Sequence, residues 1–174
     1  MTRAAAPLAL RHDPPHSSAL ELQEEPSQLL RCLRGADHQP PVPSPKLAGA
    51  RAQLVSRPQS VAAVEKLAAA CTKHGVPLTV RGAGTGNYGQ CVPLEGGVVM
   101  LTTGLQRIRR FDPATGIVTV EPGCQMSQLD QELRRHHREL RLLPSTWRSA
   151  TVGGFVAGGS GGIGSVRWGF LRDP

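Results

Sequence analysis

The chain has 174 residues, a formal net charge of +7, 39% hydrophobic residues and only 3% aromatic residues. This length suits one ordinary domain with a buried core, and the composition excludes an acidic disordered chain. No apolar run reaches the roughly 18 to 20 residues that a membrane-spanning helix needs. The 20 glycines and 15 prolines lack the period of collagen, so collagen, a coiled coil and a disulfide miniprotein are excluded as well.

Residues 1–50 contain seven prolines after position 13, and we expect them to form a lead-in with one helix, over Ser18–Leu33. The apolar run Ala4–Leu10 is short and no clear small-residue cleavage site follows it, so no signal peptide is predicted. A cytoplasmic location is the corresponding expectation. Residues 51–174 are expected to form one domain.

The first elements of that domain are a strand, a helix and a second strand. We expect the first strand over Ala52–Ser56 and a helix that Ser60 caps. One apolar stripe of this helix has the spacing i, i+3, i+4 and i+7, in Val64, Leu67, Ala68 and Cys71. Gly75 ends the helix, and the second strand covers Val76–Val80. The pattern predicts a βαβ unit with parallel strands.

The elements that follow indicate a second, mixed subdomain. Strands are expected over Gly97–Leu101 and Ile117–Glu121, with a turn at Asp112–Gly116 between them. A helix over Ser127–His137 begins with an S/T-x-x-D capping pattern. A short strand over Leu140–Leu143 ends at a proline. The fold class is therefore α+β: a βαβ subdomain followed by the start of a second subdomain.

Neither the cysteines nor the arginines predict a site of their own. The four cysteines, Cys32, Cys71, Cys91 and Cys124, lack the spacing of a metal site, so we expect free thiols and no metal. The basic charge leaves a nucleic-acid-binding module as an alternative function. We expect no nucleic-acid partner, because Glu132 and Glu139 interrupt the densest group of arginines and aromatic residues for base stacking are scarce.

Twelve of the 20 glycines lie in two windows, 82–89 and 153–169. The first window directly follows the predicted strand over Val76–Val80. Glycine is costly within regular structure, but it lets a backbone approach a ligand closely and present N–H groups to an anion. The apolar residues within the second window argue against a flexible linker there. Both windows are therefore candidate ligand-binding segments.

The first window matches neither of two common phosphate-binding loops. A Walker A loop requires Lys followed by Ser or Thr after its last glycine, but Gln90 and Cys91 stand there. A Rossmann loop opens a helix, whereas Gly89 is followed by Pro93, two further glycines and a predicted strand. The pattern that remains is a strand–loop–strand anion cradle with Arg81 beside it and the hydroxyl of Thr85 within it.

Taken together, the motifs resemble the FAD-binding domain of the vanillyl-alcohol oxidase/p-cresol methylhydroxylase (PCMH) type, in its glycolate oxidase D-subunit and D-lactate dehydrogenase branch. The resemblance covers residues 57–174. It is carried by Arg57–Val61, Val76–Thr85, Val120–Gly123, Pro144–Thr146, Ala150–Gly154 and Gly158–Gly169. Several ordered motifs are far more specific than a single glycine loop.

The resemblance implies a role for each matching stretch. The FAD pyrophosphate would lie on Gly82, Ala83, Gly84, Thr85, Gly86 and Asn87. Because a guanidinium suits the geometry of a phosphate, we expect Arg81 or Arg148 to help neutralise its charge. Pro144 and Ser145 would line the flavin side. The ribityl chain and the isoalloxazine would pass against Thr151, Gly153, Gly154, Gly158 and Gly159. Branches that tether FAD covalently have a histidine where Thr85 stands, so we expect noncovalent FAD.

The resemblance further implies a flavin-dependent oxidoreductase that oxidises a small 2-hydroxy acid or alcohol by hydride transfer to the flavin. Family members continue with the rest of the FAD domain and a substrate domain. We therefore expect this chain to be a C-terminally incomplete FAD domain that contains no catalytic residue and is inactive alone. A small-molecule substrate is expected only in an intact form. The alternative in this class is a noncatalytic truncated remnant.

Overall fold

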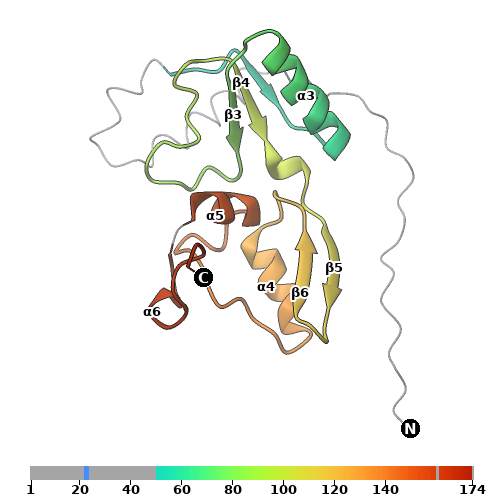
Figure 1. Ribbon diagram of the computed structural model, residues 1–174, viewed down its shortest axis with the longest axis vertical. Coiled ribbons are helices and arrows are strands. Elements are labelled where there is room, and N and C mark those ends of the chain that lie inside the picture. The colour runs from blue at the N-terminus through green and yellow to red at the C-terminus, as the bar shows by residue number, and fades with distance from the viewer. Residues whose placement is uncertain (1–21, 24–49, 160, 174) are drawn as a thin grey trace.

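The computed structural model describes residues 22–23, 50–159 and 161–173, which form two lobes, one above the other in Figure 1. The first lobe contains a four-stranded sheet and helix α3 (Val61–Lys73). The second contains an antiparallel hairpin and the helices that follow it in the chain. This mixture confirms the α+β fold class. The lead-in lies outside the described residues, apart from residues 22–23 and 50.

The sheet of the first lobe has the strand order β1-β2-β4-β3. Strands β2 (Leu54–Ser56), β4 (Val98–Leu101) and β3 (Leu78–Arg81) are parallel, which confirms the βαβ prediction. The two strands of the βαβ unit are not neighbours, because β4 lies between them. Strand β1 (Leu22–Gln23) pairs antiparallel with β2, so these two residues are extended where a helix was expected. The rest of that expected helix lies outside the described residues.

Helix α3 forms and packs as its sequence predicts. The Ser60 hydroxyl accepts a hydrogen bond from the N–H of Ala63 at 3.2 Å, and Gly75 follows the helix with φ +63°. Leu67 and Cys71 are buried against Val98 and Met100 of β4, so the predicted stripe faces the sheet. Because burying a large aliphatic side chain is worth about 1.5–3 kcal/mol, this contact fixes the helix on the sheet.

The second lobe begins with a hairpin that the sequence predicted only in part. Strand β6 (Ile117–Val120) and the turn before it were expected, but β5 (Ile108–Asp112) was missed. Three of the five β5 residues are charged, which hides the alternation that identifies a strand. A register shift between Ile108 and Arg110 disturbs the pattern further. The pKa of Asp112 is lowered, first by a hydrogen bond from the side chain of Thr115 and then by the N–H groups of Ala114 and Thr115, which donate to the carboxylate.

Helix α4 (Met126–Arg134) is shorter than predicted, and the expected capping pattern is wrong. Its N-cap is Gln125, which makes no side-chain cap bond. Ser127 lies inside the first turn, and its hydroxyl donates to the carbonyl of Arg148 at 3.0 Å. The helix starts earlier because the Met126 N–H donates to the carbonyl of Ala150, a tertiary contact that local sequence does not reveal.

The final segment also differs from expectation. The strand predicted at Leu140–Leu143 does not form; Leu143 makes only an isolated bridge with Ile163. Residues of the second glycine window instead form helix α5 (Val152–Gly158), and a short helix α6 (Ser165–Trp168) follows. Phe155 anchors α5 in a core with Met126 and Ala150. Among the described residues, no helix is both long enough and apolar enough to cross a bilayer.

Candidate cofactor-binding site

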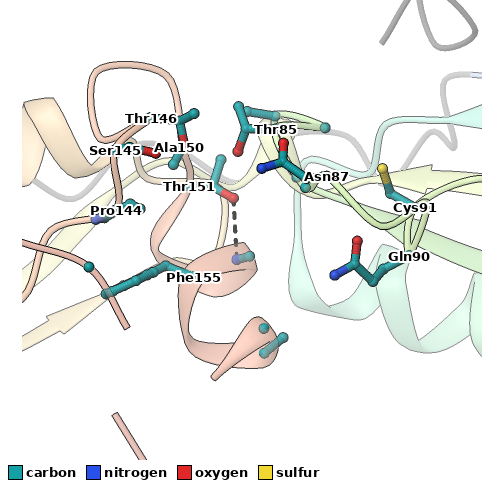
Figure 2. A pocket seen from close by; sticks show the side chains of 18 of the residues that line it. Thr85, Asn87, Gln90, Cys91, Pro144, Ser145, Thr146, Ala150, Thr151 and Phe155 are labelled. Atoms are coloured by element: carbon teal, nitrogen blue, oxygen red, sulfur yellow. Dashed lines mark hydrogen bonds between the residues drawn. The ribbon is translucent and has the colours of Figure 1, made fainter. Parts of the chain in front are cut away.

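A cavity of about 600 Å³ lies where the two lobes meet. One wall is the segment 82–91, which follows β3 and which we call the glycine loop. The opposite wall consists of residues 144–146 and α5. Figure 2 shows Thr85 and Asn87 of the glycine loop facing Ser145, Thr146 and Thr151 across the cavity. The site therefore depends on both lobes.

The glycine loop is irregular and pairs with no strand in the part of the chain that the structure describes. Within the described residues, the N–H groups of positions 83–87 donate to no acceptor in the chain. Gly84 has φ +72°, and a Cβ there would collide with the guanidinium of Arg81, which is buried directly beneath the loop. Successive free N–H groups around a glycine turn form a concavity suited to an anion. The loop thus provides both the donors and a neighbouring positive charge.

Helix α5, in contrast, uses the N–H groups of its first turn within the protein. Val152 donates to the carbonyl of Cys124 and Gly153 to that of Pro122, at 2.8 and 2.9 Å. The N–H of Gly154 donates to the hydroxyl of Thr151, the N-cap, at 3.3 Å. Because these groups are satisfied, α5 contributes a packed wall rather than a set of anion donors. A Cβ at Gly82 would collide with Oγ1 of Thr151, so the two walls touch there.

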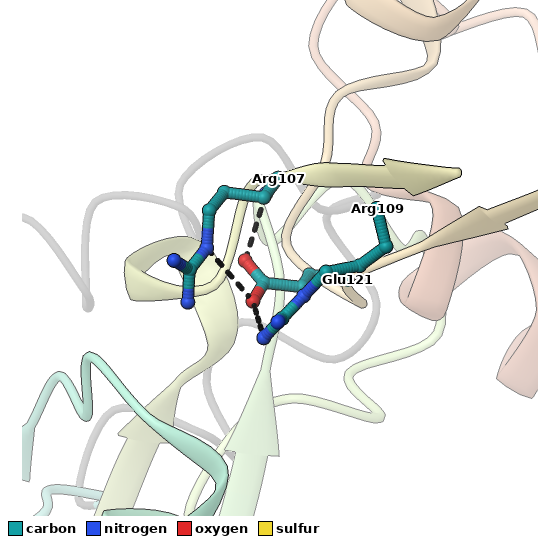
Figure 3. A network of polar contacts seen from close by, with 3 residues as sticks. All are labelled: Arg107, Arg109 and Glu121. Carbon is teal, nitrogen blue, oxygen red and sulfur yellow. Dashed lines mark hydrogen bonds and ion pairs between the residues drawn. The ribbon is translucent and has the colours of Figure 1, made fainter. Parts of the chain in front are cut away.

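Residues 122–124, which accept the first N–H groups of α5, directly follow the buried carboxylate of Glu121 (Figure 3). Glu121 is 5% exposed; it accepts the backbone N–H of Arg107 at 2.7 Å and the Nε–H of Arg107 at 3.2 Å, and it pairs with Arg109. Burial opposes ionisation, but these donors and charges outweigh it and hold the pKa of Glu121 below its ordinary value. An ionised Glu121 thereby fixes the strand end next to Pro122 and Cys124.

The structure brings together most of the residues that the sequence singled out. The cavity is lined by Gly82, Ala83, Gly84, Thr85, Gly86, Asn87, Pro144, Ser145, Thr151, Gly154 and Gly158. Three others do not line it. Arg81 is buried under the loop, Gly153 packs against Pro122, and Gly159 ends α5 beside Arg172.

Sequence reasoning missed other parts of the wall. Within the described residues, the cavity is also lined by Val80, Tyr88, Gln90, Cys91, Thr146, Ala150, Phe155, Ala157, Gly161, Gly162 and Ile163. Several of these directly follow predicted positions, so continuity along the chain was the available signal. Phe155 and Ala157 face the cavity only because this segment is helical. No signal in the sequence indicated that orientation, because no helix was predicted over this segment.

Comparison with known proteins identifies the family of the chain. The model of the family described as "FAD binding domain" matches residues 52–174. The chain belongs to this FAD-binding family. The match covers both lobes and both glycine windows, and it confirms the resemblance expected from the motifs.

Three curated relatives of this FAD-binding chain illustrate the family. The chain is 31% identical over 119 residues to glycolate oxidase subunit GlcD of Escherichia coli strain K12, and 34% identical over 115 residues to D-lactate dehydrogenase of Anaerostipes hadrus. It is 29% identical over 120 residues to a probable mitochondrial D-2-hydroxyglutarate dehydrogenase of Oryza sativa subsp. indica. The matches cover 68%, 66% and 69% of this chain. The chain spans about a quarter of the length of these relatives.

A solved structure of alkyldihydroxyacetonephosphate synthase has the same fold over this region. The two superpose with a TM-score of 0.63 at 23% identity, over 70% of this chain and 25% of the other. At this identity the likeness concerns the fold alone. It shows that the two-lobed arrangement also occurs in a larger protein.

The residues around the cavity fit the cofactor that the family name states. The free N–H groups at 83–87 are donors for the diphosphate, which is the anionic part of FAD. Apolar groups on the opposite wall, among them Pro144, Phe155 and Ile163, suit a flat aromatic ring. The absence of Cβ atoms at Gly82 and Gly84 lets the loop pack closely against Thr151 and the Arg81 guanidinium.

Proposed function

We propose that this chain binds FAD noncovalently in the cavity between its lobes, as the FAD-binding part of an oxidoreductase for a small 2-hydroxy acid or alcohol. The observation that carries the proposal is the set of N–H groups at 83–87, which have no acceptor among the described residues and face a packed wall across a cavity of about 600 Å³. Membership of the FAD-binding family supports the same cofactor.

Each wall would have its own task. The glycine loop would hold the diphosphate through its backbone and the Thr85 hydroxyl, with the charge of Arg81 acting from beneath. Pro144 and Ser145 would line the flavin side, and Thr151, Gly154 and Gly158 would border the ribityl chain and the ring. Gly153 and Gly159 would act indirectly, by shaping α5. The chemistry that FAD supplies when bound is the acceptance of a hydride.

We propose noncovalent attachment because Thr85 stands at the position of the tethering histidine that the resemblance implies, and a hydroxyl cannot form that bond. Among the described residues, no histidine lines the cavity. Denaturation with acid followed by filtration should therefore release all flavin into the filtrate. Flavin that remains with the precipitated protein would contradict this assignment.

The substrate class follows from the relatives, whose names refer to glycolate, D-lactate and D-2-hydroxyglutarate. We assign no catalytic residue to this chain.

We also propose residues 51–174 as the FAD-binding unit, with residues 1–50 as its lead-in. A cytoplasmic location is supported by the free thiols of Cys71, Cys91 and Cys124, because reducing compartments preserve thiols.

An absorbance spectrum of the purified chain, recorded with and without added FAD beside circular dichroism, tests the proposal. We expect a folded chain that retains flavin bands after gel filtration. Riboflavin provides a matched comparison, because it has the ring and the ribityl chain without the diphosphate. A folded chain that retains no FAD at micromolar concentration would overturn the proposed function.

A further inference from the structure

We propose that Gln90 is a positioning residue for the glycine loop and that its amide nitrogen contacts the diphosphate of the cofactor. The proposal rests on the proposed function, because it assumes FAD in the cavity, but it concerns a residue for which the motifs gave no role. Gln90 lies at the end of the glycine loop, in the cavity wall and outside the regular elements. Two contacts of its side chain and the direction of its amide nitrogen lead to this role.

The first contact fixes the end of the loop. The Oε1 atom of Gln90 accepts the backbone N–H of Tyr88 at 3.2 Å. This bond closes a small ring across Gly89, which has φ +77° and turns the chain. The N–H of Tyr88 therefore has an acceptor, whereas the N–H groups of positions 83–87 have none among the described residues. One end of the loop is tied down, and the donors before it stay available.

The second contact places the amide against the backbone of the loop. A Cβ at Gly86 would lie 2.9 Å from Oε1 of Gln90 and 3.6 Å from its Cδ. The side chain of Gln90 therefore covers Gly86, on a different part of the loop from the Arg81 guanidinium at Gly84. The side chains of Arg81 and Gln90 thus limit the movement of the loop. They occupy the space that Cβ atoms at Gly84 and Gly86 would fill.

The third observation concerns the other end of the amide. Only the oxygen of the amide can accept the N–H of Tyr88, so Oε1 faces Tyr88 and Nε2 lies at the other end of the amide. Figure 2 shows the amide nitrogen of Gln90 directed toward the cavity and α5. No acceptor for Nε2 is found in the part of the chain that the structure describes. Because the bond between Oε1 and Tyr88 holds the amide in place, Nε2 is a fixed donor beside the glycine loop. Such a donor suits a phosphate oxygen of the cofactor.

Two substitutions separate the two ends of the amide. Gln90→Met keeps the length of the side chain and removes both the acceptor and the donor. Gln90→Glu keeps the acceptor for Tyr88 but replaces the donor by a negatively charged oxygen. Gln128→Met is a matched control, because Gln128 is exposed on α4 and does not line the cavity. Circular dichroism and thermal unfolding would verify that each variant is folded.

We would measure the dissociation constants of FAD, ADP and riboflavin by calorimetry or by flavin fluorescence. Gln90→Met should weaken FAD and ADP about 10-fold, the effect of one hydrogen bond to a charged group, and change riboflavin less than about 2-fold. Gln90→Glu should weaken FAD further, by about 30-fold at low salt, and part of that loss should disappear as salt screens the repulsion. Gln128→Met should bind all three ligands like the wild type.

Two results would overturn the role of Gln90 alone. One is wild-type affinity for FAD in Gln90→Met, and the other is an equal loss of FAD and riboflavin, which indicates a merely structural role. If the wild-type chain itself binds no FAD, the proposed function fails, and the role of Gln90 fails with it. The two failures are therefore distinguishable in one set of titrations.

Discussion

The two glycine-rich regions have similar composition but use glycine for different purposes. In the glycine loop, the N–H groups at 83–87 have no acceptor among the described residues, and the backbone is open to the cavity. In α5, the first N–H groups are bound by Cys124, Pro122 and Thr151, and Gly153 lets the helix approach Pro122. The comparison teaches that a glycine cluster marks either free backbone donors or close packing, and that hydrogen-bond partners distinguish the two.

The largest expected effect is on the glycine loop. Gly84→Val places a β-branched side chain at φ +72° and against the Arg81 guanidinium, so the loop must rearrange. We expect FAD affinity to fall by about 100-fold or more, because several backbone donors move together. Titration with FAD measures this effect. Gly116→Val is the control, since Gly116 has the same φ of +72° in the β5–β6 turn with open space around it; it should lose some stability and keep its flavin affinity.

The corresponding change in α5 should act on stability first. A Cβ at Gly153 would lie 2.6 Å from Cβ of Pro122 and 2.8 Å from its carbonyl oxygen. Gly153→Val should therefore lower the free energy of unfolding by about 1–3 kcal/mol, as overpacking does. Urea denaturation gives the value. If Gly153→Val lost flavin binding at unchanged stability, α5 would be a direct binding element, and the contrast between the regions would be wrong.

Glu121→Gln tests whether the buried carboxylate of Glu121 stabilises the segment against which α5 packs. At neutral pH we expect a loss of about 1–3 kcal/mol, because a buried carboxylate with charged donors is replaced by a neutral amide. The pKa of Glu121 is lowered in the folded chain, so its contribution is complete above the ordinary value of 4.5 and is lost as the pH falls through the lower folded-state pKa.

Unfolding measured from pH 7 to pH 3 should show this acid-dependent loss in the wild type and a smaller one in Glu121→Gln. The control is Glu132→Gln, which removes a more exposed pair with Arg135 and should change stability by no more than about 0.5 kcal/mol. An equal loss in both variants would show that Glu121 has no special role.

The smallest effect is expected at Thr151. Thr151→Ala removes the hydroxyl that accepts the N–H of Gly154 and should cost about 1 kcal/mol of stability. Thr151→Ser retains the cap and should recover most of that stability in thermal unfolding. The N–H groups of the glycine loop are not affected by either change, so FAD affinity per folded molecule should fall by less than about 3-fold.

Much of the first lobe could be predicted because its signals are local. The hydroxyl of Ser60, the stripe through Leu67 and Cys71, and Gly75 specify α3 within its own residues. The order of the strands was not predicted, because pairing of β4 between β2 and β3 depends on contacts across the chain. In the second lobe, β5 was missed because its charged residues hide the strand alternation, although its partner β6 is close in the sequence. The start of α4 was misjudged because its partner, the carbonyl of Ala150, is distant in the sequence.

The sequence by itself determined the family, the α+β class and the position of the glycine loop, since glycine spacing and strand periodicity act over a few residues. Only the tertiary structure decided that the second window begins in a helix and that the first N–H groups of this helix are satisfied by Pro122 and Cys124. It also decided that Gln90 covers Gly86. The physical reason is that a donor is free or bound according to which acceptor the fold brings to it, and several of these acceptors come from distant parts of the chain.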